Sequence, residues 1–271
     1  MKNRKLIYTI LTLIISIFLY VSNTNKEKST PQKDNDGVVD VVLDTNFDYL
    51  PTTTTHQIIK HKYYTLSYNE KYEQAEWVAY ELTPNHIKHI DRKRPYFIYD
   101  KKVKSKSANY RNYKKSGYDK GHLVPAGDMR FSFDAFNDTF YTSNISPQNH
   151  QFNAGLWNRL EQKVRYWTKK YGNLYIITGG VLKNGLKKIG DEKVAVPNQF
   201  YKIILDYSNK NKPKAIAFLM PNKDSNKPLY KFTTSIDAIE KLTGIDFFPA
   251  LPDDVENRLE SKSDYKGWSF R

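Results

Sequence analysis

The chain has no cysteine among its 271 residues. Disulfide bonds, thiolate nucleophiles and cysteine-ligated zinc sites are therefore excluded. Acidic residues are also scarce relative to basic ones, with 29 Asp and Glu against 43 Lys and Arg and a formal net charge of +14. Such an excess of positive charge favours polyanionic partners, either nucleic acid or an anionic membrane surface, without choosing between them.

Long apolar runs are missing except for residues 6–21, which follow Lys2, Arg4 and Lys5. A basic start before an apolar run is typical of an export signal. As a helix the run would rise about 24 Å, which is short for a hydrocarbon core of about 30 Å. Residues 1–21 are thus predicted to be either a cleaved signal peptide or a retained membrane anchor. The protein is expected to be exported, to an extracellular or periplasmic location or to the outer face of the membrane.

Residues 22–55 are poor in apolar side chains and predict a flexible polar linker, because such a composition cannot bury enough surface to offset ordering. Within them, residues 38–43 could add an edge strand. A folded domain is predicted over residues 56–271. Its strands and helices are mixed along the chain, which favours an α+β fold in a single domain. Strands are expected at 61–68, 76–82, 174–181, 200–206 and 214–220, and helices from Thr83, at 134–142, at 152–171 and at 234–243.

Two stretches concentrate the residue types that phosphodiester chemistry needs. Residues 116–129 contain Asp-Lys-Gly-His, ending at His122, and then Leu-Val-Pro. Residues 143–161 begin with Ser-Asn-Ile-Ser-Pro-Gln and end with Asn-Ala-Gly-Leu-Trp-Asn-Arg-Leu-Glu. An imidazole titrates near neutrality and suits a general base, but a histidine after a glycine is weak evidence when taken alone.

Together the two stretches resemble the DNA/RNA non-specific endonuclease family of the ββα-metal superfamily, which includes the endonuclease G-type enzymes. That family carries Asp-Arg-Gly-His, Asn-Ile-x-Pro-Gln and Asn-x-x-x-Trp-x-x-Leu-Glu at this spacing, and the resemblance covers about residues 60–250. It implies a central antiparallel sheet flanked by helices, with a ββα-metal active site. Lys120 stands where the family usually has arginine. The charge is kept but the planar fork is lost, so the role of this position stays open.

The resemblance also implies roles for individual residues. His122 would be the general base, and Asn153 the sole direct protein ligand of a magnesium ion, for which manganese could substitute. Glu161 lies eight residues further along the predicted helix, about 12 Å, and is expected to reach a metal-bound water instead. Asn144 would orient the phosphate or hold the hydrogen-bond network of the site. Trp157 is expected in the core.

A phosphate-binding arginine is implied upstream of His122, with Arg94 as the better match and Arg92 as the alternative. Seven basic residues and no acid follow in residues 101–115, interleaved with Tyr110 and Tyr113. A solvated charged face and a phosphate-tracking surface both remain open for this run.

These features predict a metal-dependent, sugar-non-specific endonuclease that contacts DNA and RNA through the phosphate backbone. The alternative is a non-catalytic nucleic-acid-binding protein of the same fold, and a second rival is a structural protein anchored in the membrane through residues 6–21. His86 and His89 have a spacing that could hold a metal, but with no third ligand nearby a solvated helix face is favoured. Oligomeric state stays open.

Overall fold

The computed structural model describes residues 47–88 and 90–270. The predicted targeting segment, most of the predicted linker, the proposed strand at 38–43 and His89 lie outside the described residues. None of the helices within these two ranges is long and apolar enough to span a membrane.

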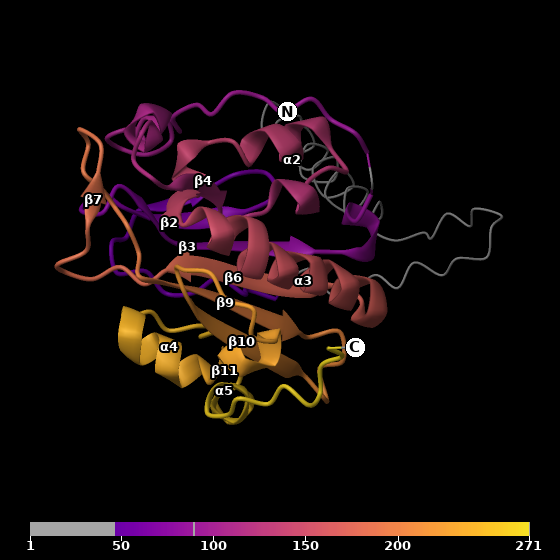
Figure 1. The fold of residues 1–271 in the computed structure, drawn as a ribbon. Helices are drawn as coiled ribbons and strands as arrows, with labels where there is room; N and C mark the ends of the chain where they lie inside the picture. Colours follow the sequence, from indigo (N-terminus) through magenta and orange to yellow (C-terminus); the bar gives the residue numbers. More distant parts are fainter. Residues whose placement is uncertain (1–46, 89, 271) are drawn as a thin grey trace, which may run out of the picture. The chain divides into compact units, whose positions relative to one another are not determined.

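A sheet of seven antiparallel strands forms the centre of the molecule (Figure 1), in the order β1-β2-β3-β6-β9-β10-β11. The strands predicted at 76–82, 174–181, 200–206 and 214–220 are all present in it. Of the strand predicted at 61–68, only residues 65–68 are in a strand, because the chain turns at residues 61–64 between β1 and β2. The bounds are β1 Ile58–Lys60, β2 Thr65–Asn69, β3 Gln74–Leu82, β6 Leu174–Gly180, β9 Gln199–Asp206, β10 Lys214–Pro221 and β11 Thr233–Thr234.

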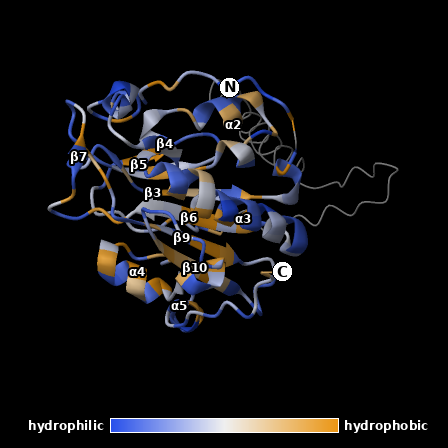
Figure 2. Ribbon diagram, in the orientation of Figure 1, coloured by the Kyte–Doolittle hydropathy of each residue, from blue (hydrophilic) through white to orange (hydrophobic). Residues whose placement is uncertain are grey.

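Successive side chains of a strand point to opposite faces of the sheet, so the buried side chains form one core on each face. In β3, Val78 and Tyr80 join the core under α3 (Asn158–Tyr171), whereas Trp77 and Ala79 join the core under the C-terminal helices. These helices are α4 (Ile236–Thr243) and α5 (Asp253–Glu260). Figure 2 shows the apolar colouring gathered on the strands between the helical layers. The predicted α+β class, with a central antiparallel sheet flanked by helices, is confirmed.

Two predicted features differ in the structure. The helix expected from Thr83 is a single 3-10 turn, Pro84–His86. The ring of His86 stacks flat on the ring of Phe131, with their centroids 3.9 Å apart. His86 is therefore a packing residue and not part of a solvated helix face.

The segment 47–55 is packed on the domain, although its composition predicts a linker. Phe47, Tyr49 and Leu50 contact the core beside α4 and α5. Thr54 donates its backbone N–H to buried Glu76 at 2.9 Å, and the Thr53 hydroxyl donates to the same carboxylate at 3.0 Å. The polar threonines of this segment thus provide hydrogen bonds to a buried carboxylate, which composition alone does not indicate.

Candidate active site

A two-stranded antiparallel ribbon carries His122. It pairs β4 (Asp119–His122) with β5 (Ile145–Gln148), so that His122 lies opposite Ile145. A Cβ on Gly121 would lie 2.2 Å from the Gln148 side chain, so only glycine fits in this strand beside that partner. Lys120 and His122 are two apart and point to the same side, where both line one pocket.

The helix that carries Asn153 and Glu161 begins with a π turn, Phe152–Trp157, before α3. The sequence predicted a regular helix here. In an α-helix, residues eight apart differ in direction by about 80°. The wider π turn takes up one extra residue, which makes the pair effectively seven apart and reduces the difference to about 20°. Asn153 and Glu161 therefore both line the pocket, while Trp157 is fully buried in the core as predicted.

The pocket has a volume of about 370 Å³ and gathers four of the five predicted site residues: Arg94, His122, Asn153 and Glu161. Arg92, the alternative to Arg94, and Lys120 also line it. The pocket thus combines cationic side chains, an imidazole, an amide and a carboxyl group, which is a set suited to a phosphate and a metal-bound water.

His122 is held neutral in this pocket. Burial, together with the positive charge of Arg94, lowers the pKa of His122 from 6.5 to about 3. Its Nε2 atom is buried and has no hydrogen-bond partner. A neutral imidazole can accept a proton from water on one of its ring nitrogens, and a bound phosphate would offset the charge of Arg94 and raise the basicity of the ring.

Asn153 is oriented by an acid that the sequence reasoning did not single out. Its Nδ2 donates to Asp119 Oδ2 at 2.9 Å, and the same oxygen lies 2.9 Å from His150 Nδ1. The amide oxygen of Asn153 has no donor among the described residues and is available to a cation. The only triad of acidic or histidine side chains close enough to share an ion in residues 47–88 and 90–270 lies elsewhere. A cation in this pocket would therefore keep most of its waters, as magnesium does.

Glu161 belongs to a buried group of mixed charge. Burial raises the pKa of Glu161 to about 7, and Lys202 acts in the opposite direction. Lys202 is 1% exposed, and its Nζ lies 4.8 Å from the centre of the Trp157 ring. Next to them, Arg165 Nη1 lies 2.6 Å from Asp128 Oδ1. Sequence reasoning missed Lys202. A lysine at an inward-facing position of the otherwise apolar strand β9 could have indicated a buried charge there.

Arg94 and Arg92 differ in their surroundings. The Arg94 guanidinium lies 5.6 Å from the centre of the Phe97 ring and 5.4 Å from that of Phe140, and no hydrogen bond engages it within the described part of the chain. Arg92 is tied through Nε to the carbonyl of Arg130 at 2.8 Å. Arg94 is thus the freer of the two to bind a phosphate.

Asn144 does not line the pocket and is fully buried. Its side chain accepts from the backbone N–H of Val124 at 2.8 Å and donates to the carbonyls of Val124 and Thr139 at 3.1 and 3.0 Å. These bonds brace the loop that follows His122. Of its two predicted roles, this geometry fits the one in the hydrogen-bond network.

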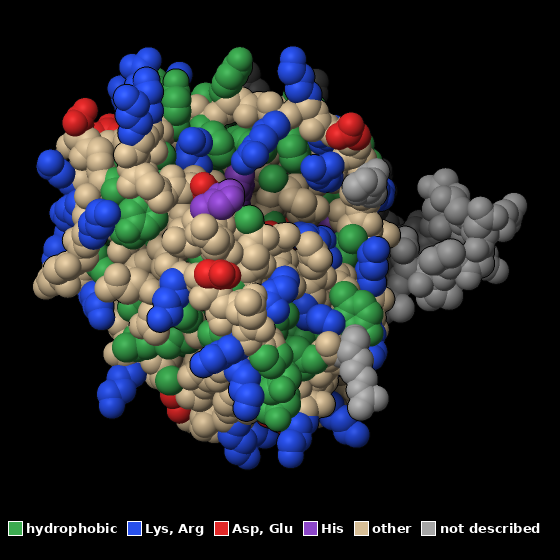
Figure 3. Space-filling model, in the orientation of Figure 1, with side chains coloured by type: hydrophobic (Ala, Val, Ile, Leu, Met, Phe, Trp, Pro, Cys, Tyr) green, Lys and Arg blue, Asp and Glu red, His purple; other side chains and the backbone are tan. Residues whose placement is uncertain are grey.

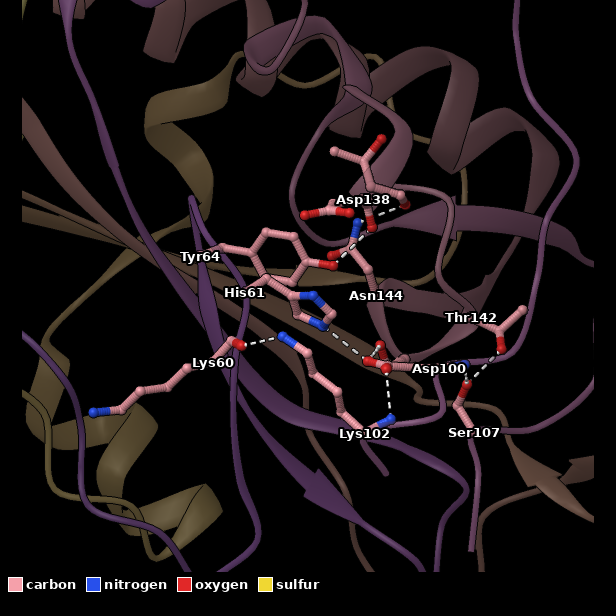
Figure 4. Close-up of polar contacts among 11 residues, drawn as sticks. Lys60, His61, Tyr64, Asp100, Lys102, Ser107, Asp138, Thr142 and Asn144 are labelled. Carbon is pink, nitrogen blue, oxygen red and sulfur yellow. Dashed lines mark hydrogen bonds and ion pairs between the residues drawn. The ribbon is translucent and has the colours of Figure 1, made fainter. Parts of the chain in front are cut away.

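A second polar network anchors the segment that carries Arg94 (Figure 4). Asp100 Oδ2 lies 2.8 Å from His61 Nε2 and accepts from the Ser143 hydroxyl at 2.7 Å. Burial would raise the pKa of Asp100, but the hydrogen bonds from His61, the Lys102 backbone and Ser143 together lower it. An ionised Asp100 therefore ties the segment that carries Arg94 to His61, which follows β1, and to Ser143.

The sequence matches the model of the DNA/RNA non-specific endonuclease family over residues 45–254. Mitochondrial nuclease EXOG of Danio rerio is 36% identical over 70% of this chain and 61% of its own length. Mitochondrial endonuclease G of Caenorhabditis elegans is 35% identical over 76% of each chain. This chain spans about three fifths of the length of the Danio and Xenopus EXOG relatives.

The fold is also similar to a solved structure, the crystal structure of the EndoG/EndoGI complex. The TM-score is 0.68 at 32% identity, and the match covers 72% of this chain and 87% of the other. The names of the relatives contradict the predicted export of the protein, because those that state a location are mitochondrial nucleases.

Proposed function

Because the chain belongs to the DNA/RNA non-specific endonuclease family, we propose that it is a metal-dependent, sugar-non-specific endonuclease that hydrolyses phosphodiester bonds of DNA and RNA. One observation carries the proposal. A buried, unpartnered imidazole nitrogen shares a pocket with an unengaged guanidinium and an amide oxygen that is open to a cation. Each group meets one requirement of phosphodiester hydrolysis.

His122 would take a proton from the attacking water through Nε2, since burial and Arg94 keep the ring neutral. Arg94 would bind the phosphate and offset the negative charge that develops in the transition state. Lys120 adds a second cation at the same pocket, although it cannot form the two-pronged contact of an arginine. Asn144 would act indirectly, by fixing the loop after His122.

The residues present fit a magnesium ion, with manganese as a substitute. Asn153 would hold it through the amide oxygen that its contact with Asp119 leaves free, and Glu161 would hold one of its waters. When bound, the ion supplies charge neutralisation for the phosphate and the departing oxygen. Asp119 fixes the amide of Asn153 in the orientation that this ligation requires.

Phosphate contacts would dominate substrate recognition. Lysine and arginine side chains are spread over the face drawn in Figure 3, with few acidic side chains between them, and the chain carries a net charge of +14. Contacts of this kind track the backbone and give little sequence preference.

A plasmid-nicking assay with and without EDTA tests this function on wild type and His122→Ala. An endonuclease nicks DNA and degrades RNA only in the presence of the metal, and His122→Ala loses most of this activity. Binding without nicking under both conditions would instead favour the non-catalytic binder of the same fold. A protein that neither binds nor nicks nucleic acid would refute both proposals.

A further inference from the structure

A second groove adjoins the catalytic pocket, and two tyrosines that line it have no role in the chemistry described above. Its volume is about 590 Å³, and Arg94, Lys120 and Asn153 line both cavities. A strand whose phosphate lies at Arg94 would therefore pass directly into this groove. Tyr96 and Tyr110 line the groove but not the pocket.

The side chain of Tyr96 extends into solvent and does not pack against the protein. It is 92% exposed, the largest value among the exposed apolar residues of the described chain, and Tyr110 is 42% exposed. Neither ring has an aromatic partner, a cation above it or a hydrogen bond among the described residues. Burial and packing therefore do not explain Tyr96, although it lies two residues from the proposed phosphate-binding arginine.

Pro95 limits the conformations of this segment. A proline fixes its own φ and biases the preceding residue toward extended backbone, so Arg94 and Tyr96 are presented from a stretch with little freedom. The Asp100 network then anchors the same segment a few residues further on. A backbone restrained in this way has little entropy left to lose when a ligand binds the Tyr96 ring.

We propose that this groove binds an unpaired nucleobase next to the scissile phosphate by stacking it on Tyr96, with Tyr110 as a further aromatic wall. The inference rests on the proposed nuclease function and deepens it. Every base has an aromatic face, so stacking tolerates any sequence. Only an unpaired base exposes that face, because the bases of a duplex are stacked on one another. The groove thus gives the enzyme a preference for single-stranded or locally unpaired nucleic acid.

Binding is measured in the full chain carrying His122→Ala, which prevents cleavage, with magnesium present. The probes are a fluorescein-labelled single strand without self-complementarity, the matching duplex, and a single strand of the same length made of abasic nucleotides. Tyr96→Ala is compared with Tyr96→Phe, which keeps the ring. Tyr99→Ala is the matched control, because Tyr99 is 39% exposed on the same segment and lines neither cavity.

Tyr96→Ala should weaken single-strand binding by about 5- to 150-fold, the range expected for losing one stacked base. Duplex and abasic binding should change less than about twofold, and Tyr96→Phe and Tyr99→Ala should bind like the parent. With His122 restored, Tyr96→Ala should raise the KM for single strands and leave kcat unchanged. Equal losses on all three probes, or no loss on the single strand, would overturn the stacking role. Absence of cleavage by wild type on any polynucleotide would instead refute the proposed function, independently of the binding result.

Discussion

The two faces of the central sheet both carry a cluster of titratable side chains, but cations accompany the acids on only one face. Under the active site, the acids Glu161 and Asp128 lie with Lys202 and Arg165. On the other face, between α4 and α5, three carboxyl groups have oxygen atoms within 4.8 Å of one another and share no cation in the described residues: Asp237, Glu240 and Glu260. Burial and the neighbouring acids raise the pKa of Glu260 to about 9.

This difference separates function from stability. In a mixed-sign cluster the cations oppose the effect of burial, so that the pKa of Glu161 beside the pocket is about 7 and the group can gain or lose a proton near neutral pH. On the other face, burial and neighbouring acids raise the pKa values of Glu240 and Glu260, so these two groups lower stability as the pH rises. Substitutions on the site face should therefore change catalysis or stability, and those on the other face should change stability alone.

The largest effect is expected from His122→Ala and Asn153→Ala. Losing the general base should slow plasmid nicking by about 10²–10⁴-fold. The Tm should fall only through the lost contacts of the ring with Phe97 and Phe140, because Nε2 makes no hydrogen bond that folding needs. Asn153→Ala should lose activity through weaker magnesium binding, so that high magnesium recovers part of it. A magnesium titration of the nicking rate checks both. Rescue of His122→Ala but not Asn153→Ala would mean that the two roles are exchanged.

Removing the offsetting cation tests the site face directly. Lys202→Met should destabilise the protein by about 3–5 kcal/mol in urea unfolding, because Glu161 is left buried beside Asp128 without its cation. The loss should grow as the pH rises above 4.5, the ordinary pKa of Glu161, since the folded chain then keeps a proton that the unfolded chain releases. The matched control, Lys202→Met with Glu161→Gln, should recover most of the stability. An equally unstable double variant would show that Lys202 acts through packing alone.

Glu76 offers an intermediate case, a buried acid that hydroxyl and backbone N–H groups satisfy in place of cations. Truncation before residue 56 removes Thr53 and Thr54 from this carboxylate. Loss of these hydrogen bonds should cost about 1–3 kcal/mol relative to truncation before residue 47, and loss of the core contacts of Phe47, Tyr49 and Leu50 should add to this cost in urea unfolding. Equal stability of the two truncated proteins would instead support a domain that begins at residue 56, as composition predicts.

The sequence predicted the sheet well because apolar runs of strand length are a local signal. Strands β3, β6, β9 and β10 follow from such runs, and α3 from apolar residues at helical spacing. The site motifs were likewise found as short stretches, and the structure brings Arg94, His122, Asn153 and Glu161 to one pocket.

What the sequence did not predict depends on contacts between distant parts of the chain. The π turn at Asn153 is a small change of helical hydrogen bonding that leaves no distinctive composition. The charge interaction of Lys202 with Glu161 and the hydrogen bond of Thr54 to Glu76 join residues that are 41 and 22 positions apart. The 3-10 turn after Thr83 shows that a local signal can also mislead, because residues that favour a helix start do not ensure that the helix continues.

The smallest effect is expected on the face without cations. Between pH 4.5 and about 9, folded Glu260 keeps a proton that the unfolded chain releases, so stability falls as the pH rises through this window. Glu260→Gln removes the titrating group while keeping its shape. It should raise the unfolding free energy at pH 8 by only about 1 kcal/mol, because water reaches the exposed rim of the cluster at Asp237. At pH 4 the variant and wild type should be equally stable, and their nicking rates should agree at both pH values. Urea unfolding at the two pH values measures the difference. A loss of stability at pH 8 would mean that Glu260 is ionised and favourably paired, and the contrast between the two faces would then fail.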